Sequence, residues 1–155
     1  MESIPLGDIE RIRSKISQEF SAWSDPIAVT QDKIKQFADV TGDHQWIHVD
    51  IERAKRESPF GGPVAHGFLT LSLLPAFRID RGWNLSGVRN VVNYGANKLR
   101  FISPVPAGAS VQARSRVIAV DPKPMGVQVT EETHIHVVGQ DKPAVIYEGI
   151  VLYVR

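Results

Sequence analysis

The sequence contains no cysteine, no long block of charge of one sign and no long apolar run. Without cysteine, the chain has no disulfide, thiolate metal site, iron–sulfur cluster or cysteine nucleophile. Eighteen basic and seventeen acidic residues leave a net charge of +1, and no basic patch suggests a nucleic-acid partner. The longest apolar stretch, residues 67–77, is too short for a membrane span, which takes about 20 residues. The first residues do not resemble a signal peptide, so we expect a soluble, cytoplasmic protein without a membrane partner.

The length and composition are those of one folded domain. The chain has 155 residues, of which 43% are hydrophobic and 23% charged, values that argue against a disordered or fibrous protein. It contains no internal repeat, low-complexity tract or linker. The sequence therefore predicts a single domain over residues 1–155, with an N-terminal helix and lead-in over residues 1–29 and a core over residues 30–155.

Helix signals lie in the first half of the chain. Apolar residues at three- and four-residue spacing predict an amphipathic helix over residues 8–20. Thr30 as an N-cap and Gly42 as a C-terminal glycine mark the ends of a second helix. A third, short helix is expected over residues 51–56, following the capping residue Asp50.

Residues 66–77 have a different character. They are apolar on nearly every face, which predicts a buried helix rather than a surface one. A loop rich in proline and glycine, residues 58–63, precedes this segment. Pro75 is expected to end or kink the helix, because proline lacks the N–H that continues it.

The sequence after Gly87 indicates β-strands. It is rich in Val, Ile, Thr and Tyr, and its segments are separated by turns that contain proline and glycine. Long neighbouring strands with short turns predict an antiparallel sheet. The expected strands cover residues 88–94, 98–103, 109–121, 126–138 and 144–155. Helices followed by strands predict an α+β fold, in its simplest form an antiparallel sheet wrapped around the central apolar helix.

Asp43 and His48 are the first candidates for chemistry. On a continuous helix they would point in different directions, but Gly42 is expected to end the helix, so both can lie on one turn. A carboxylate beside an imidazole that titrates near neutral pH forms an acid–base pair. The spacing also allows a structural alternative, in which Asp43 and Asp50 cap turns and His48 is an ordinary polar residue.

Gly67 is the second candidate. It follows His66 at the expected start of the apolar helix, where a free backbone N–H can receive developing negative charge. Such a donor contributes about 3–4 kcal/mol of transition-state stabilisation in well-studied enzymes. The alternative is that Gly67 only allows the loop and the helix to pack closely.

Patterns for other kinds of site are weak or absent. His44 and His48 are four residues apart, and residues 132–136 carry alternating Glu and His, but Gly42 interrupts the first pair and the second is typical of a polar sheet face. We therefore predict no metal site. Neither a serine nucleophile elbow nor a glycine-rich nucleotide loop is present.

A small polar and cationic group lies just before residues 101–104. It consists of Asn97, Lys98 and Arg100, and Arg114 and Arg116 alternate on the following strand. Guanidinium and ammonium groups of this kind suit phosphates. The alternative is that they form the solvated face of a sheet.

Three segments of the chain resemble those of one family. Residues 37–48, with Ala54 after them, look like the hydratase-2 motif of the MaoC-like dehydratases, which include the (R)-specific enoyl-CoA hydratases. Residues 63–68 and 93–108 resemble the second and third landmarks of that family, so the resemblance runs from about Thr30 to the C-terminus. The sequence of these segments is most similar to that of the nodulation-protein-N-like subgroup, which includes mycobacterial (R)-hydroxyacyl-CoA dehydratases. One departure is Gln45-Trp46, where the widespread motif has Asn-Pro.

The resemblance implies a hotdog fold and a reversible hydration that needs no cofactor. A water held between Asp43 and His48 would add to C3 of a trans-2-enoyl-CoA thioester, and the product would be a (3R)-hydroxyacyl-CoA. The Gly67 N–H would stabilise the thioester oxygen. A homodimer with sites at its interface is also implied. The residues expected to contact the acyl-CoA substrate are Gln45, Trp46, His66, Asn97, Lys98 and Arg100.

Two other functions stay open on the sequence. A hotdog acyl-CoA thioesterase would place a lone carboxylate on the central helix, and residues 68–77 contain none. A non-catalytic acyl-thioester-binding module is the other, because a fold does not guarantee an activity and Gln45-Trp46 departs from the motif.

Overall fold

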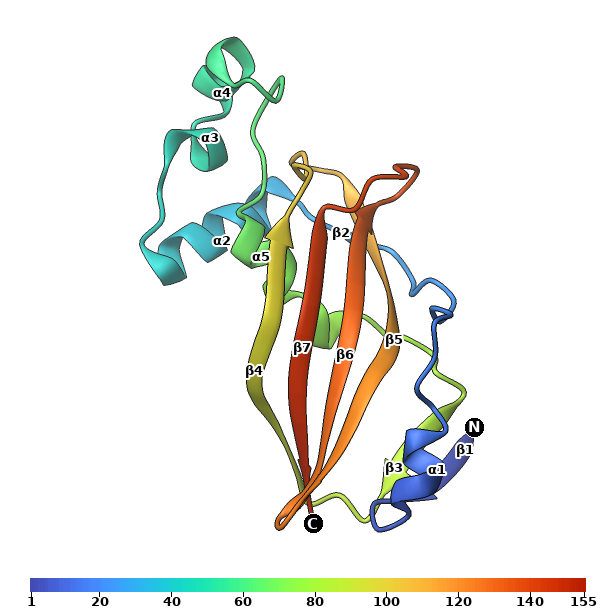
Figure 1. Cartoon of the computed structure of the whole chain (residues 1–155). Coiled ribbons are helices and arrows are strands. Elements are labelled where there is room, and N and C mark those ends of the chain that lie inside the picture. The colour runs from blue at the N-terminus through green and yellow to red at the C-terminus, as the bar shows by residue number, and fades with distance from the viewer.

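A curled antiparallel sheet occupies most of the second half of the chain (Figure 1). The computed structural model describes residues 1–155. Side chains on β5 alternate between buried and half-buried positions, as a strand with one face on a core requires. The strands follow the order β2-β5-β6-β7-β4, with bounds β2 (Ile27–Ala28), β4 (Asn90–Phe101), β5 (Ser110–Lys123), β6 (Gly126–Val137) and β7 (Val145–Val154).

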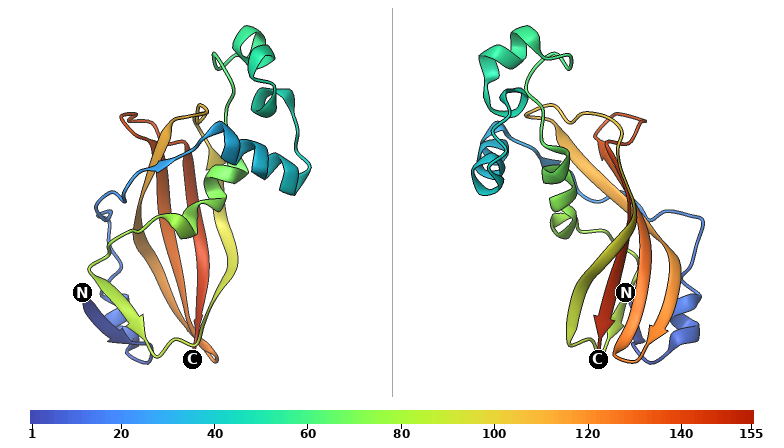
Figure 2. Two further views of the ribbon diagram at one scale, coloured as in Figure 1. Left: turned by 180° about the vertical axis from the view of Figure 1, so that it is seen from behind. Right: turned by 60° about the vertical axis from the view of Figure 1, so that its left-hand side comes forward.

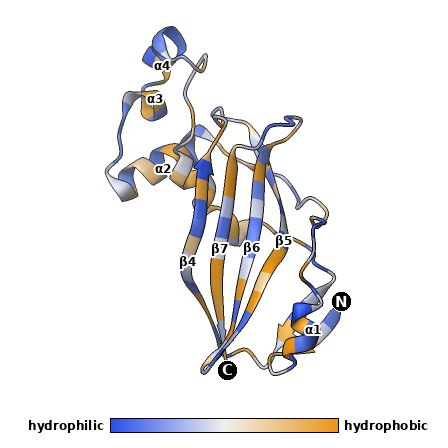
Figure 3. Ribbon diagram, in the orientation of Figure 1, coloured by the Kyte–Doolittle hydropathy of each residue, from blue (hydrophilic) through white to orange (hydrophobic).

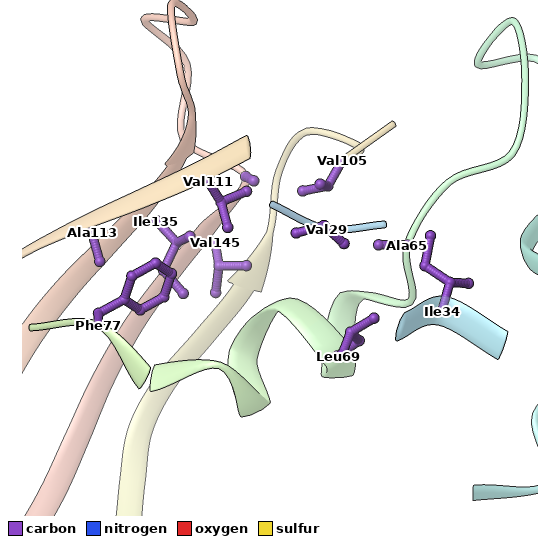
Figure 4. Close-up of a cluster of buried hydrophobic side chains, with 11 residues drawn as sticks. Val29, Ile34, Ala65, Leu69, Phe77, Val105, Val111, Ala113, Ile135 and Val145 are labelled. Carbon is purple, nitrogen blue, oxygen red and sulfur yellow. The ribbon is translucent and has the colours of Figure 1, made fainter. Parts of the chain in front are cut away.

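The concave face of the sheet is covered by α5 (Gly67–Ser72) and the short 3-10 helix η1 (Leu74–Ala76), as both views of Figure 2 show. The core between them is made of aliphatic and aromatic side chains. Leu69 and Phe77 belong to this core together with residues of the strands, and Phe77 lies beside Ile135 (Figure 4). Burying each such side chain stabilises the fold by roughly 1.5–3 kcal/mol. The predicted α+β architecture, an antiparallel sheet wrapped around a helix, is therefore confirmed.

Three helices project from one end of the sheet: α2 (Gln31–Thr41), α3 (Trp46–Val49) and α4 (Ile51–Glu57) (Figure 1). The predicted caps are confirmed. The side chain of Thr30 accepts a hydrogen bond from the Lys33 N–H, and Gly42 ends α2 in the left-handed conformation. Asp50 caps α4, which is hydrophilic over most of its length and buries only Ala54 (Figure 3).

The N-terminal segment packs at the opposite end of the sheet. It contains β1 (Glu2–Pro5) and α1 (Ile9–Arg13), and β1 pairs in parallel with β3 (Trp83–Ser86). A second core forms where Ile4 and Ile12 meet Val127. None of the helices is long and apolar enough to cross a membrane.

The helix predicted over residues 8–20 is wrong beyond Arg13. The N–H groups of Ser17, Ser21 and Ser24 instead donate to carbonyls along β5. The open edge of β5 offers unpaired backbone acceptors, and these hold the segment in an irregular path despite its helical spacing. Phe20 therefore lies over the sheet rather than on a helix, with its ring centroid 4.6 Å from that of His134.

Two other expectations need correction. The strands predicted over residues 88–94 and 98–103 are one strand, β4, which has two irregularities in its pairing with β7. The apolar helix is shorter and less covered than expected, because it ends at Ser72 and Phe68 is 60% exposed. Pro75 lies in η1, so the prediction that it ends the α-helix is confirmed.

Candidate active site

Asp43 lies on the turn between α2 and α3. Gly42 has φ +77°, a conformation that side chains rarely tolerate, and this glycine allows the chain to leave the helix sharply. The hydroxyl of Thr41 accepts from the Asp43 N–H at 3.4 Å, and the Asp43 carboxylate accepts from the Gln45 N–H at 3.3 Å. One carboxylate oxygen is therefore held over its own turn, and the residue as a whole is exposed.

His48 lies one turn further on, in α3, and is 7% exposed. Its Nδ1 is 2.7 Å from the carbonyl oxygen of Val64. Because a carbonyl only accepts hydrogen bonds, Nδ1 carries the proton and the neutral ring presents an unprotonated Nε2. Burial lowers the pKa of His48, and the nearby His66 lowers it further, against the opposing effects of the Val64 hydrogen bond and the Asp43 charge. The ring is therefore mostly neutral at pH 7 and can take a proton.

His66 contacts both Asp43 and His48. Its ring is stacked on that of His48, with centroids 3.9 Å apart, and its Nε2–H donates to the backbone carbonyl of Asp43 at 2.9 Å. Phe37 also packs against the His66 ring, with a centroid distance of 5.0 Å. The His66 side chain thus fixes the Asp43 turn against the start of α5.

Asp43, His48 and His66 together form a compact cluster. Each offers one oxygen or nitrogen atom, and these atoms all lie within 4.8 Å of one another. A single water molecule, or a divalent metal ion, can contact such a set. The absence of a metal from this site therefore stays a prediction. His44, the other histidine of the turn, pairs instead with Asp39 at 2.9 Å, and that contact raises the pKa of His44.

Gly67 is the first residue of α5. Its N–H donates to no acceptor within the chain, as expected at a helix start. A Cβ at this position would lie 2.7 Å from Cδ1 of Phe101, so a side chain has no room. The close packing proposed for Gly67 is therefore real, and it leaves the N–H free.

The remaining candidates are divided between two places. Gln45 and Trp46 lie at the start of α3 beside the cluster, and the Trp46 ring is covered by the guanidinium of Arg53 at 4.3 Å. Asn97, Lys98 and Arg100 lie on β4 and are exposed. Phe101 packs on Gly67, so its side chain lies on the face of β4 that is turned toward α5. Lys98 and Arg100 are three residues and one residue before Phe101, and side chains alternate along a strand, so both point to the opposite face.

Two contacts that define the cluster could not be predicted from the sequence. The carbonyl of Val64 sets the protonation of His48, and every residue carries such a carbonyl, so no side-chain pattern can single it out. Phe37 was identified as part of a motif, but its packing on His66 joins residues 29 positions apart in sequence and becomes visible only in the fold.

The chain is similar to several known proteins. The family model described as a MaoC like domain matches residues 13–138. The chain is 48% identical over 132 residues to 3-hydroxyacyl-thioester dehydratase Z of Mycobacterium tuberculosis, covering 84% of this chain and 86% of that protein. It is 39% identical over 161 residues to nodulation protein N of Rhizobium leguminosarum bv. viciae, covering 98% of this chain and 92% of that protein.

A solved structure shares the fold over the whole chain. It is a protein of Archaeoglobus fulgius described as a monoamine oxidase regulatory protein, with a TM-score of 0.76 and 24% sequence identity. The match covers 100% of this chain and 99% of the other. The hotdog architecture that the sequence predicted is confirmed by this likeness.

Proposed function

Because the chain belongs to the MaoC-like dehydratases and is a hydro-lyase, we propose that it reversibly hydrates trans-2-enoyl-CoA thioesters to (3R)-hydroxyacyl-CoA. Asp43 and His48 are the acid–base pair in this proposal. The observation that carries it is the cluster itself: an exposed carboxylate and an unprotonated imidazole nitrogen, close enough to share one water. The 3-hydroxyacyl-thioester dehydratase activity named for the mycobacterial relative is consistent with the same chemistry.

His48 starts the hydration. Its Nε2 takes a proton from the shared water while the water oxygen forms a bond to C3 of the substrate. The electron pair of the C2–C3 double bond moves toward the thioester oxygen, and the enolate formed in this way is the species that needs stabilisation. The lowered pKa of His48 keeps its ring neutral and ready at pH 7.

Asp43 holds the water from the other side and orients it. The acid–base pair then returns a proton to C2 on the same face, which restores the site and completes the addition of water. Dehydration is the same sequence in reverse. A positioned acid or base of this kind contributes about 10²–10⁴-fold to the rate.

Gly67 stabilises the enolate. Its N–H is free, lies at the start of α5 and follows directly on His66, which contacts both members of the pair. Removing one such donor from an enzyme costs about 10²–10³-fold in kcat.

We also propose that two copies of this chain form a homodimer. Residues 90–98 of β4 are exposed, including the apolar side chains Val91, Val92 and Tyr94, and one edge of the strand has no neighbour. An open, partly apolar edge strand is a template for pairing with another strand. In a dimer joined there, Lys98 and Arg100 would lie beside the partner and could reach the phosphates of its CoA. Analytical ultracentrifugation tests the homodimer, and the mass of a single chain would contradict it.

The activity is tested on enoyl-CoA substrates of short, medium and long chain. We expect the enoyl absorbance to fall on addition of enzyme, and chiral analysis to identify the (3R) product. No hydration at any chain length would overturn the proposal. Release of free CoA would indicate a thioesterase instead, and tight binding of enoyl-CoA without turnover would indicate a non-catalytic module.

A further inference from the structure

A glutamine outside the cluster holds the backbone of the helix that carries His48. Gln31 is the first residue of α2, and its side-chain Nε2 donates a hydrogen bond to the carbonyl oxygen of His48 at 2.7 Å. The two residues are 17 positions apart in the sequence. No other side chain donates to the backbone of α3. The Gln31 amide therefore links the start of α2 directly to the residue proposed as the base.

The position of α3 depends on contacts of this kind because the helix is a single turn. It has four residues, and its N-cap residue Gln45 makes no side-chain capping hydrogen bond. A helix this short is not stable by itself. The N–H of Val64 donates to the carbonyl of Ile47 at 3.0 Å, and Gln31 donates to the next carbonyl, that of His48. Two neighbouring carbonyls of α3 are thus bound by two separate segments of the chain.

The other end of α2 leads to Asp43. The helix begins at Gln31 and ends at Thr41, and Gly42 then turns the chain to Asp43. Thus α2 is connected to both members of the acid–base pair, to His48 through the Gln31 amide and to Asp43 through the chain itself. Without the amide, α3 can shift relative to α2, and the two reacting groups move apart or out of line. A displacement of about 1 Å at a reaction centre can cost about 10²-fold in rate.

The Gln31 side chain contributes little to stability. A carbonyl only accepts hydrogen bonds, so Nε2 faces His48 and Oε1 points elsewhere. Oε1 is buried and makes no hydrogen bond within the chain. A buried oxygen without a partner costs at least as much free energy as one ordinary hydrogen bond contributes. The two effects offset each other, so the value of the Gln31 amide lies in where it holds His48.

We propose that Gln31 is a positioning residue, which holds the carbonyl of His48 so that the ring stays within reach of a water bound by Asp43. In this role Gln31 acts through His48 and takes no part in proton transfer. The inference rests on the hydratase function proposed above, and it adds the residue that sets the geometry of the base.

Gln31→Met removes the donor and keeps a side chain of similar volume. We expect kcat for crotonyl-CoA to fall by about 10–10²-fold and KM to stay within about twofold, because Gln31 acts on His48 and not on the substrate. The melting temperature should stay near that of the wild type, because the lost hydrogen bond and the removed unsatisfied oxygen offset each other. Gln31→Lys restores a donor and should recover most of kcat. Lys33 on the same helix already donates in this way, to the carbonyl of Ala28 at 2.6 Å.

A second glutamine of α2 supplies the matched control. The amide of Gln36 donates to the carboxylate of Asp32 at 2.8 Å, on the exposed side of the helix. Gln36→Met should therefore keep the wild-type kcat. A wild-type kcat in Gln31→Met as well would overturn the inference, and so would an equal loss in Gln31→Met and Gln36→Met.

The ¹⁵N NMR signals of the His48 ring test the inference without relying on activity. They are identified by their absence from His48→Gln. A ring whose proton is fixed on Nδ1 by the carbonyl of Val64 gives well-separated signals for its two nitrogens. In Gln31→Met we expect these signals to move toward each other as the ring samples both tautomers. Unchanged signals would overturn the inference even if kcat falls. A wild-type enzyme that does not hydrate crotonyl-CoA would refute the hydratase function, and the His48 signals would still decide the role of Gln31.

Discussion

Replacing Gly67 by proline separates the two roles of this residue, which are close packing and hydrogen-bond donation. Any side chain at this position meets Phe101, since a Cβ would lie 2.7 Å from Cδ1 of the ring. Overpacking of this kind costs about 1–3 kcal/mol of stability. Both variants to be compared therefore carry Phe101→Leu to make room, one with Gly67→Ala and the other with Gly67→Pro.

The backbone accepts proline at this site. Gly67 is the first residue of α5, where the missing N–H removes no helical hydrogen bond. His66 before it has φ −59° and ψ 137°, which suits a residue that precedes proline. The two double variants thus differ in the Gly67 N–H and little else, and their melting temperatures should be similar.

The hydration of crotonyl-CoA provides the assay. We expect the alanine variant to retain most of the activity of Phe101→Leu alone. The proline variant should lose about 10²–10³-fold in kcat, the usual cost of one missing oxyanion donor. Equal kcat values in two variants of equal stability would refute the donor role and leave Gly67 a packing residue.

Three further results are expected. As the pH falls, kcat/KM should drop to half its maximum at a pH below 6.5, the ordinary pKa of histidine, because the pKa of His48 is lowered and the base works only when unprotonated. A half-maximum on the acid side above pH 7 would contradict this. Dialysis against a metal chelator should leave kcat unchanged, and activity restored only by a divalent ion would show that the Asp43 cluster holds a metal. Leu69→Ala should lower the free energy of unfolding in urea by about 2–5 kcal/mol, because Leu69 is 7% exposed within the core under the sheet; a loss below 1 kcal/mol would mean that the core collapses around the gap.

Features set by local chemistry could be predicted from the sequence. Thr30 and Gly42 mark the ends of α2 because a side-chain acceptor and a left-handed glycine act on their own neighbours. The same glycine made it clear that Asp43 and His48 need not lie on one helix. The strands could be recognised because their alternation reflects the two faces of a sheet.

Features set by contacts between residues far apart in the sequence could not be predicted from it. The segment after Arg13 has helical spacing, yet the carbonyls of β5 determine its path. The orientation of His48 depends on Val64, 16 residues away, and on stacking with His66. Glu131 gave no signal either, since a glutamate in an alternating strand is usually on the solvated face, whereas in the fold it is 8% exposed and paired with Arg81.

The variants Asp43→Asn and His48→Gln test the central claim most directly, with His44→Gln as a control on the same turn. His44 is half-exposed and pairs with Asp39 rather than with the cluster. The measurement is the initial rate of crotonyl-CoA hydration, with the melting temperature of each variant recorded beside it. We expect Asp43→Asn and His48→Gln each to lose about 10²–10⁴-fold in kcat while folding is retained, and His44→Gln to stay near the wild-type rate. A folded Asp43→Asn or His48→Gln enzyme that keeps more than about a tenth of the wild-type rate would contradict the assignment of this pair.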